Sequence, residues 1–579
     1  MLYFFYSDNS YSMVDTLHAL IRSAVPENVH FSLTPSERAE FGHYSSNIAL
    51  VLSKQLGKNP RVVAEELLAK IKTADTAGFI ANIEIAGPGF LNFWFSEKAL
   101  DNAFRNVLKA GKKWGSQRIN KKRPTVVIDY SHPNIAKPMS VAHLRSTIIG
   151  ASLVNIFKFL GWKTIGDNHL GDWGKQFGIL IAAIKGQRQT INDKQSTKKK
   201  ISIQDLMKLY VDYTARMKED AALEDVARAE TKKLQDGDRE NTALWKQFYK
   251  ISLREFKKFY TRLGIKFDYY LGESFYKEML PGIVAGALEK GIAEKSEGAV
   301  IIPIEGLSPF VIQKSDEAFL YSTTDIAAVQ YRRERFKPDL VLYVVDNGQS
   351  LHFEQLFKVV EKLDYKGEMQ LQHVKFGLVL GEDMKKLSTR AGKHISLGEV
   401  LDEAVVRAKA LVDEKRTDLS ERERRKIAEA VGIAAVKYND LSQNRQSDIA
   451  FQWDKMLNFE GNSAPYLLYS YARMRSILRK GRFTRGGGKT LAGPHDRALF
   501  LKLVEFPNVL RRVEETFFPN LLTDYLFELS KATNAFYEQE PVLKAEPAVR
   551  ASRLLLVRAV SETLKTGLGL LGIKALERM

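Results

Sequence analysis

The first 112 residues carry two kinds of apolar spacing. Apolar side chains recur every three to four residues in Leu17–Ala24, Ser46–Gly57 and Pro60–Ala74, which predicts three amphipathic helices. Ile83–Phe95 instead alternates apolar and polar positions like a strand, and a Gly-Pro-Gly sequence interrupts it. We therefore expect residues 1–112 to form a small α+β domain.

Residues 113–435 show a different pattern, in which short apolar runs alternate with helical segments. These runs are Thr125–Tyr130, Leu340–Asp346 and Val374–Leu380. Strands that alternate with helices are typical of a parallel sheet covered on both faces. A long, highly charged helical stretch interrupts the alternation at Ile203–Leu263, so we expect an insertion over about residues 187–300 to pack beside the sheet.

Strand signals stop after about Asp402, and helical patterns dominate to the end of the sequence. The main predicted helices are Leu419–Tyr438, Ala464–Lys480, Asp496–Glu515, Asn520–Tyr537 and Ala548–Thr566. Three consecutive glycines at 486–488 predict a flexible loop inside this region. We therefore expect residues 436–579 to form an all-helical domain, and the whole chain to be a multidomain α/β protein.

Charge and cysteine content narrow the functional classes. The formal net charge is +18 and the pI is about 9.5, which favours a polyanionic partner, with nucleic acid ahead of a membrane surface. A solvated basic surface with no partner is the alternative. The sequence has no cysteine, which excludes disulfides, thiolate nucleophiles and Cys-ligated zinc. No stretch approaches the roughly 20 apolar residues that span a bilayer, so we expect a soluble, cytoplasmic protein.

The segment Thr125–Gly150 carries the clearest chemistry. It reads as a β-branched strand, a loop rich in Pro, Asn and Lys, and then an amphipathic helix with a histidine in its first turn. A strand that runs into a helix N-terminus presents unpaired backbone N–H groups and the positive end of the helix dipole to an anion. Lys137 and His143 add side-chain donors, so the segment suits the phosphate chain of a nucleotide.

Motifs along the whole chain resemble the arginyl-tRNA synthetase family of class I. They are PNIAKPMSVAHLRSTIIG, NHLGDWGKQFG, YSTTDIAA, DNGQSLHFEQLF, FEGNSAPYLLYSYAR and LGLLGIKALERM, together with GHYSSNIALVLSKQLGKNP and AGPGFLNF near the N-terminus. The resemblance implies a Rossmann-type catalytic core that joins L-arginine to ATP as arginyl-adenylate, releases pyrophosphate and transfers arginine to tRNA(Arg), leaving AMP. It also implies that activation generally requires bound tRNA, that the N-terminal domain contacts the tRNA elbow, and that the helical C-terminal domain binds the anticodon.

The resemblance also assigns the ATP site. His143 matches the second histidine of the family's HxGH signature and is expected at the phosphates, with Lys137 as a mobile positive charge. The KMSKS-like loop corresponds to KKLSTR, in which Lys386 aligns with the first lysine. The remaining residues implied at the adenine and ribose are Ala142, Gly348, His352 and Gln355. The expected cofactor is ATP with Mg2+; no tightly bound cofactor and no protein metal site are expected.

One signature departs from the family pattern. SVAH stands where the family usually has HVGH or HAGH, so Ser140 replaces a histidine and Ala142 a glycine. Loss of a donor aimed at the phosphates costs roughly 10²–10³ in rate by analogy with oxyanion donors. Ser140 still offers a hydroxyl, and His132 is the candidate substitute. Two alternatives stay open: a catalytically weakened paralogue that binds tRNA without charging it, and a different nucleotidyl transferase on the same sheet.

A guanidinium substrate requires carboxylates and favours an aromatic face nearby. Tyr321 and Asp325 are four residues apart on a predicted helix and so share a face. They match the family's substrate-binding Tyr and Asp, although a helix-capping role for Asp325 is the alternative. The other residues that the resemblance implies at arginine are Asp129, Asn134 and Gln349, with His132 and His169 as weaker candidates.

The helix predicted at Ala464–Lys480 interleaves tyrosines with arginines, a pattern suited to stacking on bases and pairing with phosphates. The candidate tRNA-binding residues are Tyr469, Arg473, Arg475, Tyr537 and Met579. We expect a monomer that contacts tRNA(Arg), arginine and ATP and does not bind a membrane.

Overall fold

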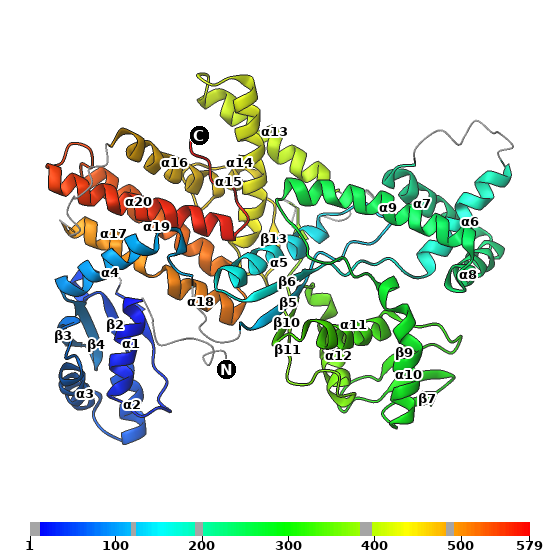
Figure 1. The fold of residues 1–579 in the computed structure, drawn as a ribbon, viewed down its shortest axis with the longest axis horizontal. Coiled ribbons are helices and arrows are strands. Elements are labelled where there is room, and N and C mark those ends of the chain that lie inside the picture. The colour runs from blue at the N-terminus through cyan, green and yellow to red at the C-terminus, as the bar shows by residue number, and fades with distance from the viewer. Residues whose placement is uncertain are drawn as a thin grey trace.

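The structure is a computed structural model that describes residues 12–36, 38–116, 123–190, 201–381, 396–481, 491 and 493–579. Figure 1 shows the small N-terminal unit below the C-terminal helices, a central sheet, and two further units that extend from the sheet on the opposite side. The predicted fold class is confirmed: a multidomain α/β chain with a parallel-sheet core, a helical insertion and a helical C-terminal region.

The N-terminal unit combines the three predicted helices with an antiparallel sheet of order β1-β2-β4-β3. The helices are α1 (Met13–Ser23), α2 (Ile48–Leu56) and α3 (Pro60–Ala74), and the strands are β1 (Leu33–Pro35), β2 (Tyr44–Ser46), β3 (Ile80–Ala86) and β4 (Phe90–Phe95). The predicted interruption is the β3–β4 turn, where Gly87 and Gly89 have φ of 51° and 136°. A short 3-10 helix, η2 (Ala39–Phe41), precedes β2, while α4 (Glu97–Ala110) and η3 (Gly111–Lys113) lead out of the unit.

The central sheet has the order β11-β10-β5-β6, and all its strands are parallel. They are β5 (Thr125–Asp129), β6 (Lys163–Asp167), β10 (Leu340–Tyr343) and β11 (Gln370–His373). Along β5, Val126 and Ile128 pack in one apolar core, and Val127 packs in another. The sheet is therefore covered on both faces, as the alternation of strands and helices predicted.

One predicted strand of this sheet is wrong. The edge strand is the polar segment Gln370–His373, whereas Val374 and Phe376 are buried in a crossing segment after it. Only β12 (Val379–Leu380) of the predicted run is a strand, and it pairs with β13 (Ile449–Ala450) outside the main sheet. The apolar run reflects burial between sheet and C-terminal helices, so hydrophobicity misplaced the strand. β13 is also an exception to the all-helical pattern predicted after residue 436.

Helices α5 (Ala142–Phe159), α11 (Tyr321–Phe336) and α12 (Ser350–Lys362) pack against the sheet, whereas α6 (Lys175–Thr190) packs against the helices of the insertion. The predicted helical insertion is present as α7 (Ile203–Glu219), α8 (Ala222–Gln235) and α9 (Arg239–Arg262). It is followed by a unit that the sequence did not predict, made of η5 (Glu273–Met279), α10 (Leu280–Glu289) and an antiparallel sheet of β7 (Glu294–Ser296), β8 (Ala299–Ile302) and β9 (Phe310–Gln313).

The C-terminal helices are α13 (Leu397–Lys415), α14 (Glu421–Leu441), α15 (Trp453–Met456), α16 (Ala464–Lys480), α17 (Pro494–Val504), α18 (Phe506–Thr516), α19 (Asn520–Gln539) and α20 (Pro547–Leu570). The single helix predicted over Asp496–Glu515 is two helices, because Pro507 lies in the first turn of α18 and cannot continue the hydrogen bonding of α17. The glycine run at 486–488 lies outside the described residues. The N-terminal unit docks on this bundle, where Arg511 pairs with Asp15 at 2.5 Å.

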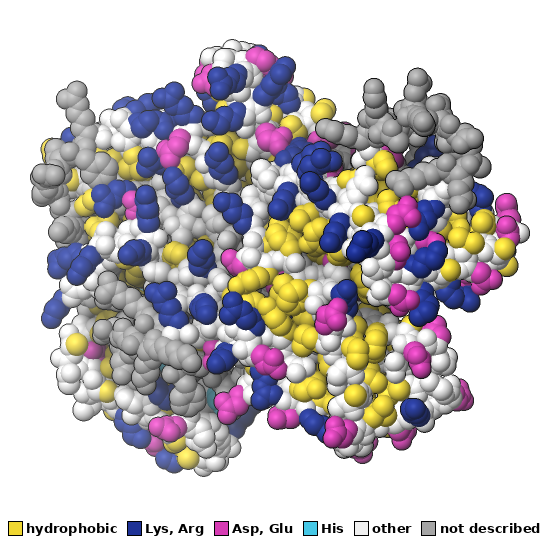
Figure 2. Space-filling model, turned by 45° about the vertical axis from the view of Figure 1, so that its right-hand side comes forward, with side chains coloured by type: hydrophobic (Ala, Val, Ile, Leu, Met, Phe, Trp, Pro, Cys, Tyr) yellow, Lys and Arg dark blue, Asp and Glu magenta, His cyan; other side chains and the backbone are white. Residues whose placement is uncertain are grey.

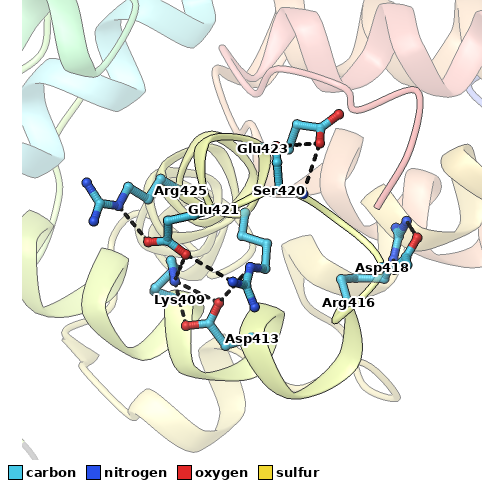
Figure 3. Close-up of polar contacts among 9 residues, drawn as sticks. Lys409, Asp413, Arg416, Asp418, Ser420, Glu421, Glu423 and Arg425 are labelled. Carbon is cyan, nitrogen blue, oxygen red and sulfur yellow. Dashed lines mark hydrogen bonds and ion pairs between the residues drawn. The ribbon is translucent and has the colours of Figure 1, made fainter.

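Helices α13 and α14 form a projecting hairpin that ion pairs join at its tip (Figure 3). The Nζ atom of Lys409 lies 2.5 Å from Asp413 on its own helix and 3.1 Å from Glu421 on the next. Exposed pairs of this kind add little to stability, because water and salt screen them. The base of the hairpin matters for the site, because the backbone N–H of Leu397 donates to the carbonyl of Met139 at 2.9 Å.

Basic side chains are spread over the face drawn in Figure 2, and hydrophobic side chains gather in a band near its centre. This distribution is consistent with the excess of Lys and Arg in the sequence. Within the described ranges, no helix is long and apolar enough to cross a membrane.

Candidate active site

The candidate site lies at the carboxyl ends of the central strands, where parallel sheets open their ligand crevice. Asp129 ends β5 and is in register with Asp167 at the end of β6 and with Tyr343 at the end of β10. Arg332 reaches this row from α11, and its Nη2 atom lies 2.7 Å from Oδ2 of Asp129 and 2.9 Å from Oδ2 of Asp167. The predicted substrate-binding Asp129 is therefore paired with a buried cation of the chain itself.

The loop after β5 is strained and firmly held. Ser131, His132 and Ala136 have φ of 86°, 51° and 65°, values that residues other than glycine rarely adopt. The backbone N–H of Ser131 donates to Oγ of Ser146 on α5 at 2.8 Å, and the Ser131 hydroxyl lies 2.8 Å from the Tyr260 hydroxyl. This turn brings Nε2 of His132 to 2.8 Å from Oδ1 of Asp129.

The altered signature forms a compact unit at the start of α5. The backbone N–H of Ser140 donates to Nδ1 of His143 at 3.1 Å, and the Ser140 hydroxyl lies 3.0 Å from the same nitrogen. Burial lowers the pKa of His143 to about 4, so the ring is neutral at pH 7. Because Nδ1 accepts, the proton is assigned to Nε2, which is a donor. Ser140 thus orients His143, while the adjacent Ala142 is exposed.

The two predicted lysines have different outcomes. Lys137 is half-buried, and its Nζ atom lies 4.8 Å from the centre of the Tyr210 ring on α7, which belongs to the helical insertion. Burial lowers the pKa of Lys137. Lys386, with the rest of KKLSTR, lies outside the described residues.

Tyr321 and Asp325 occupy the first turns of α11, as predicted, and meet α12 there. The Nε2 atom of His352 lies 2.7 Å from Oδ2 of Asp325, and the His352 ring centre is 5.0 Å from that of Tyr321. His352, which the sequence placed at ATP, therefore lies with the candidate arginine-binding residues. The N-cap of α11 is Leu320, so Asp325 is not a capping residue.

A second acidic residue near Asp325 escaped the sequence analysis. Glu273, on η5, accepts the backbone N–H of Trp173 at 3.2 Å. Burial raises its pKa to about 8, with further contributions from the negative charges of Asp172 and Asp325. Glu273 and Asp325 are 52 positions apart in the sequence, and no local pattern signals that they are close. A buried carboxyl group whose pKa is raised by nearby negative charge is a candidate partner for a cation.

The remaining candidate ligand-binding residues are distributed around this edge of the sheet. Asn134 is exposed and forms a backbone bridge with Gly171, at which an added Cβ would lie 2.2 Å from Oδ1 of Asn134. Gly348 and Gln349 are exposed in η6 (Asn347–Gln349), just after β10. Gln355 is buried instead, and its amide donates to the carbonyl of Ser308 at 2.7 Å.

His169 lies at the end of this cluster, where its ring stacks with that of Tyr276 at 5.7 Å between centres. Its Nδ1 atom is buried and has no hydrogen-bond partner among the described residues. In the part of the chain that the structure describes, no group of three or more His, Asp or Glu residues is placed to hold a metal ion.

The predicted tRNA-binding residues fall into two groups. The guanidinium carbon of Arg473 lies 4.3 Å from the centre of the Tyr537 ring and 6.0 Å from that of Tyr469, and both tyrosines are exposed. Arg475 instead pairs with Glu577 of the C-terminal segment, at 2.6 Å. Met579 is partly buried against the apolar core.

Three family models match the chain in succession. The model for the arginyl tRNA synthetase N terminal domain matches residues 13–95, that for the class I (R) tRNA synthetase catalytic domain matches 103–453, and the DALR anticodon binding domain matches 467–579. Proteins named arginine--tRNA ligase from Fusobacterium nucleatum and Laribacter hongkongensis are 44% and 43% identical to this chain. Those alignments cover 94% and 97% of this chain and 95% and 98% of the relatives.

Solved structures agree with this match. Arginyl-tRNA synthetase from Plasmodium falciparum has a TM-score of 0.83 at 29% identity, over 98% of both chains. The enzyme from Thermus thermophilus has a TM-score of 0.79 at 25% identity, over 98% of this chain and 100% of that one. The resemblance inferred from the sequence motifs is confirmed, and this chain belongs to the arginyl-tRNA synthetase family of class I aminoacyl-tRNA synthetases.

Proposed function

We propose that this protein attaches L-arginine to tRNA(Arg) through arginyl-adenylate, with release of pyrophosphate and AMP. The observation that carries the proposal is the carboxylate of Asp325, held by His352 beside the Tyr321 ring, together with the neutral His143 at the start of α5. A cationic side chain and a phosphate chain are the two ligands that such a pair of sites complements.

In the proposed activation step, the arginine carboxylate attacks the α-phosphate of ATP, the bond from that phosphorus to the bridging oxygen breaks, and pyrophosphate leaves. Negative charge grows on the phosphate oxygens during this step. Nε2–H of His143 and the ammonium of Lys137 are the donors that we assign to that charge. ATP is expected to enter with Mg2+, with Gly348 and Ala142 beside the nucleotide and Lys386 as a further phosphate-binding cation.

Arginine specificity is assigned to the first turns of α11 and to η5. The guanidinium is placed between the carboxyl groups of Asp325 and Glu273, with Tyr321 as a stacking surface. The α-ammonium is assigned to Asp129, with Asn134 and Gln349 completing the contacts. Tyr343 is in register with Asp129 at the end of β10, and burial raises its pKa to about 12.

The tRNA is assigned to the basic surface of the C-terminal helices. Exposed Tyr469 and Tyr537 flank Arg473, an arrangement that suits stacking on unpaired bases and contact with phosphates. We also infer a monomer that acts in the cytoplasm, where charged tRNA is consumed and where a protein without cysteine needs no oxidising environment.

Pyrophosphate exchange into ATP tests this function. We expect exchange with arginine and tRNA(Arg), and background exchange when lysine or citrulline replaces arginine, because lysine lacks the planar fork of donors and citrulline lacks the charge. Transfer of labelled arginine to tRNA then tests the second step. Binding of tRNA(Arg) without either activity would instead identify a non-catalytic paralogue.

A further inference from the structure

The centre of the candidate site contains an ion cluster that the proposed chemistry has not used. The side chain of Arg332 is 1% exposed, and one nitrogen, Nη2, bridges the carboxylates of Asp129 and Asp167. The opposite oxygen of Asp129, Oδ1, accepts from Nε2 of His132. Each oxygen of Asp129 is thus fixed by a different donor.

The charges of this cluster leave a defined excess. Burial raises the pKa of Asp167. When both carboxylates are ionised, they and the guanidinium carry one net negative charge, which one ammonium group balances. The groups that face the guanidinium are the ring of Tyr343, 5.4 Å from the guanidinium carbon, and the hydroxyl-bearing side chain of Tyr276. Without the guanidinium between them, the two buried carboxylates would repel each other or take up a proton, because desolvation penalises each negative charge.

Arg332 also belongs to the helix that holds the other end of the substrate. It follows Asp325 by seven residues, or about two helical turns, so both side chains lie on the same side of α11. One helix therefore carries both Asp325 and the arginine that pairs with the Asp129 carboxylate.

We propose that Arg332 is a positioning residue for arginine activation, which holds the Asp129 carboxylate in the orientation that binds the α-ammonium of the substrate. The inference rests on the proposed function and extends it. Arg332 itself does not touch the substrate; it acts through Asp129. It therefore affects recognition of the ammonium end and leaves recognition of the guanidinium end to Asp325 and Glu273.

The test uses the full chain with Arg332→Gln, Arg332→Lys and, as a matched control, Arg335→Gln, which removes an exposed arginine one turn further along α11. Arginine-dependent pyrophosphate exchange gives KM for arginine and for ATP. We expect Arg332→Gln to raise KM for arginine about 10- to 100-fold with KM for ATP within about twofold of wild type. Arg332→Lys keeps the positive charge, so we expect its KM for arginine to lie between those of the wild type and Arg332→Gln.

A second measurement separates positioning from general damage to the pocket. 5-Guanidinovalerate is arginine without its α-ammonium, so its inhibition constant should be the same for wild type and both Arg332 variants. The inference is overturned if the inhibition constant of 5-guanidinovalerate rises in Arg332→Gln by the same factor as KM for arginine. It is also overturned if KM for arginine in that variant stays within about twofold of wild type. If Arg332→Gln fails to fold, the Lys variant carries the test. Absence of arginine-dependent exchange in the wild type would refute the proposed function instead.

Discussion

The imidazole of His352 and the carboxylate of Asp325 are 2.7 Å apart and join the first turns of α12 and α11. This contact links two segments that the family motifs place in different roles, one at ATP and one at arginine. Because the His352 ring also packs against Tyr321, the histidine orients both the acidic and the aromatic part of the proposed guanidinium pocket. It gives the pocket a defined shape before any substrate arrives.

Asp325→Asn is expected to raise KM for arginine about 100-fold or more, because a guanidinium then loses a charged, bidentate partner in a partly desolvated site. KM for ATP should change little, and pyrophosphate exchange reports both constants. Glu334→Gln, on the exposed face of the same helix, is the control and should behave as wild type. An unchanged KM for arginine in Asp325→Asn would remove this residue from the pocket.

Glu273 predicts a pH dependence of arginine binding. Its pKa of about 8 means that the carboxyl group is mostly protonated at pH 7, whereas a bound guanidinium favours the ionised form. Arginine binding therefore releases a proton, and KM for arginine should fall by up to about tenfold per pH unit as the pH rises towards 8, then level off. Exchange assays between about pH 6.5 and 8.5 measure this slope.

Glu273→Gln removes the titrating group and should flatten that profile. Near pH 6.5 the variant and the wild type should have similar KM values, because the wild-type group is then neutral, and they should diverge as the pH rises. A wild-type profile that is already flat, or a variant that keeps the slope, would assign the titration to another group.

Several of these residues were accessible from the sequence, and others were not, for identifiable reasons. The resemblance to the family's motifs singled out Asp129, Tyr321 and Asp325. Local pattern placed Asp129 at the end of a strand, and Tyr321 and Asp325 on one face of a helix, as observed. Arg332 lies in the run YRRERF, which reads as a solvated face, although its spacing of seven from Asp325 indicates the same side of the helix. Glu273 depends on a contact between distant segments, which periodicity does not encode.

The edge strand of the central sheet was also difficult to predict from local sequence pattern. The apolar run at Val374–Leu380 predicts a strand, because burial and strand formation give similar patterns. The observed edge strand, Gln370–His373, is polar because half of it faces solvent. The antiparallel unit formed by β7, β8 and β9 was missed because its strands are short. The sequence pattern therefore predicted the carboxyl ends of the central strands, where the candidate site lies, better than it predicted the edge strand.

His143→Ala is expected to lower kcat of activation by about 10²–10³ while leaving the Kd for tRNA unchanged, since the Nε2–H donor acts on charge that develops in the transition state. Ser140→Ala provides the graded comparison. It deletes the hydroxyl but keeps the backbone N–H that donates to Nδ1, so its effect should be much smaller. Equal losses in the two variants would mean that the hydroxyl itself acts on the phosphates.

The Arg473 and Tyr537 pair makes a prediction about tRNA alone. Tyr537→Ala removes a stacking surface and should raise the Kd for tRNA(Arg) by about 10-fold with little change in its salt dependence, because base stacking releases no counterions. Arg473→Gln should weaken binding and also reduce the slope of log Kd against log salt by about one unit. Binding titrations at several salt concentrations separate the two effects.

Arg475→Gln is the control for Arg473→Gln. Glu577 lies 2.6 Å from Arg475 and already neutralises this arginine, so the Arg475→Gln substitution should leave the salt slope nearly unchanged. If all three variants changed the slope equally, the basic surface would act as an undifferentiated field, and the assignment of specific contacts to Arg473 and Tyr537 would fail.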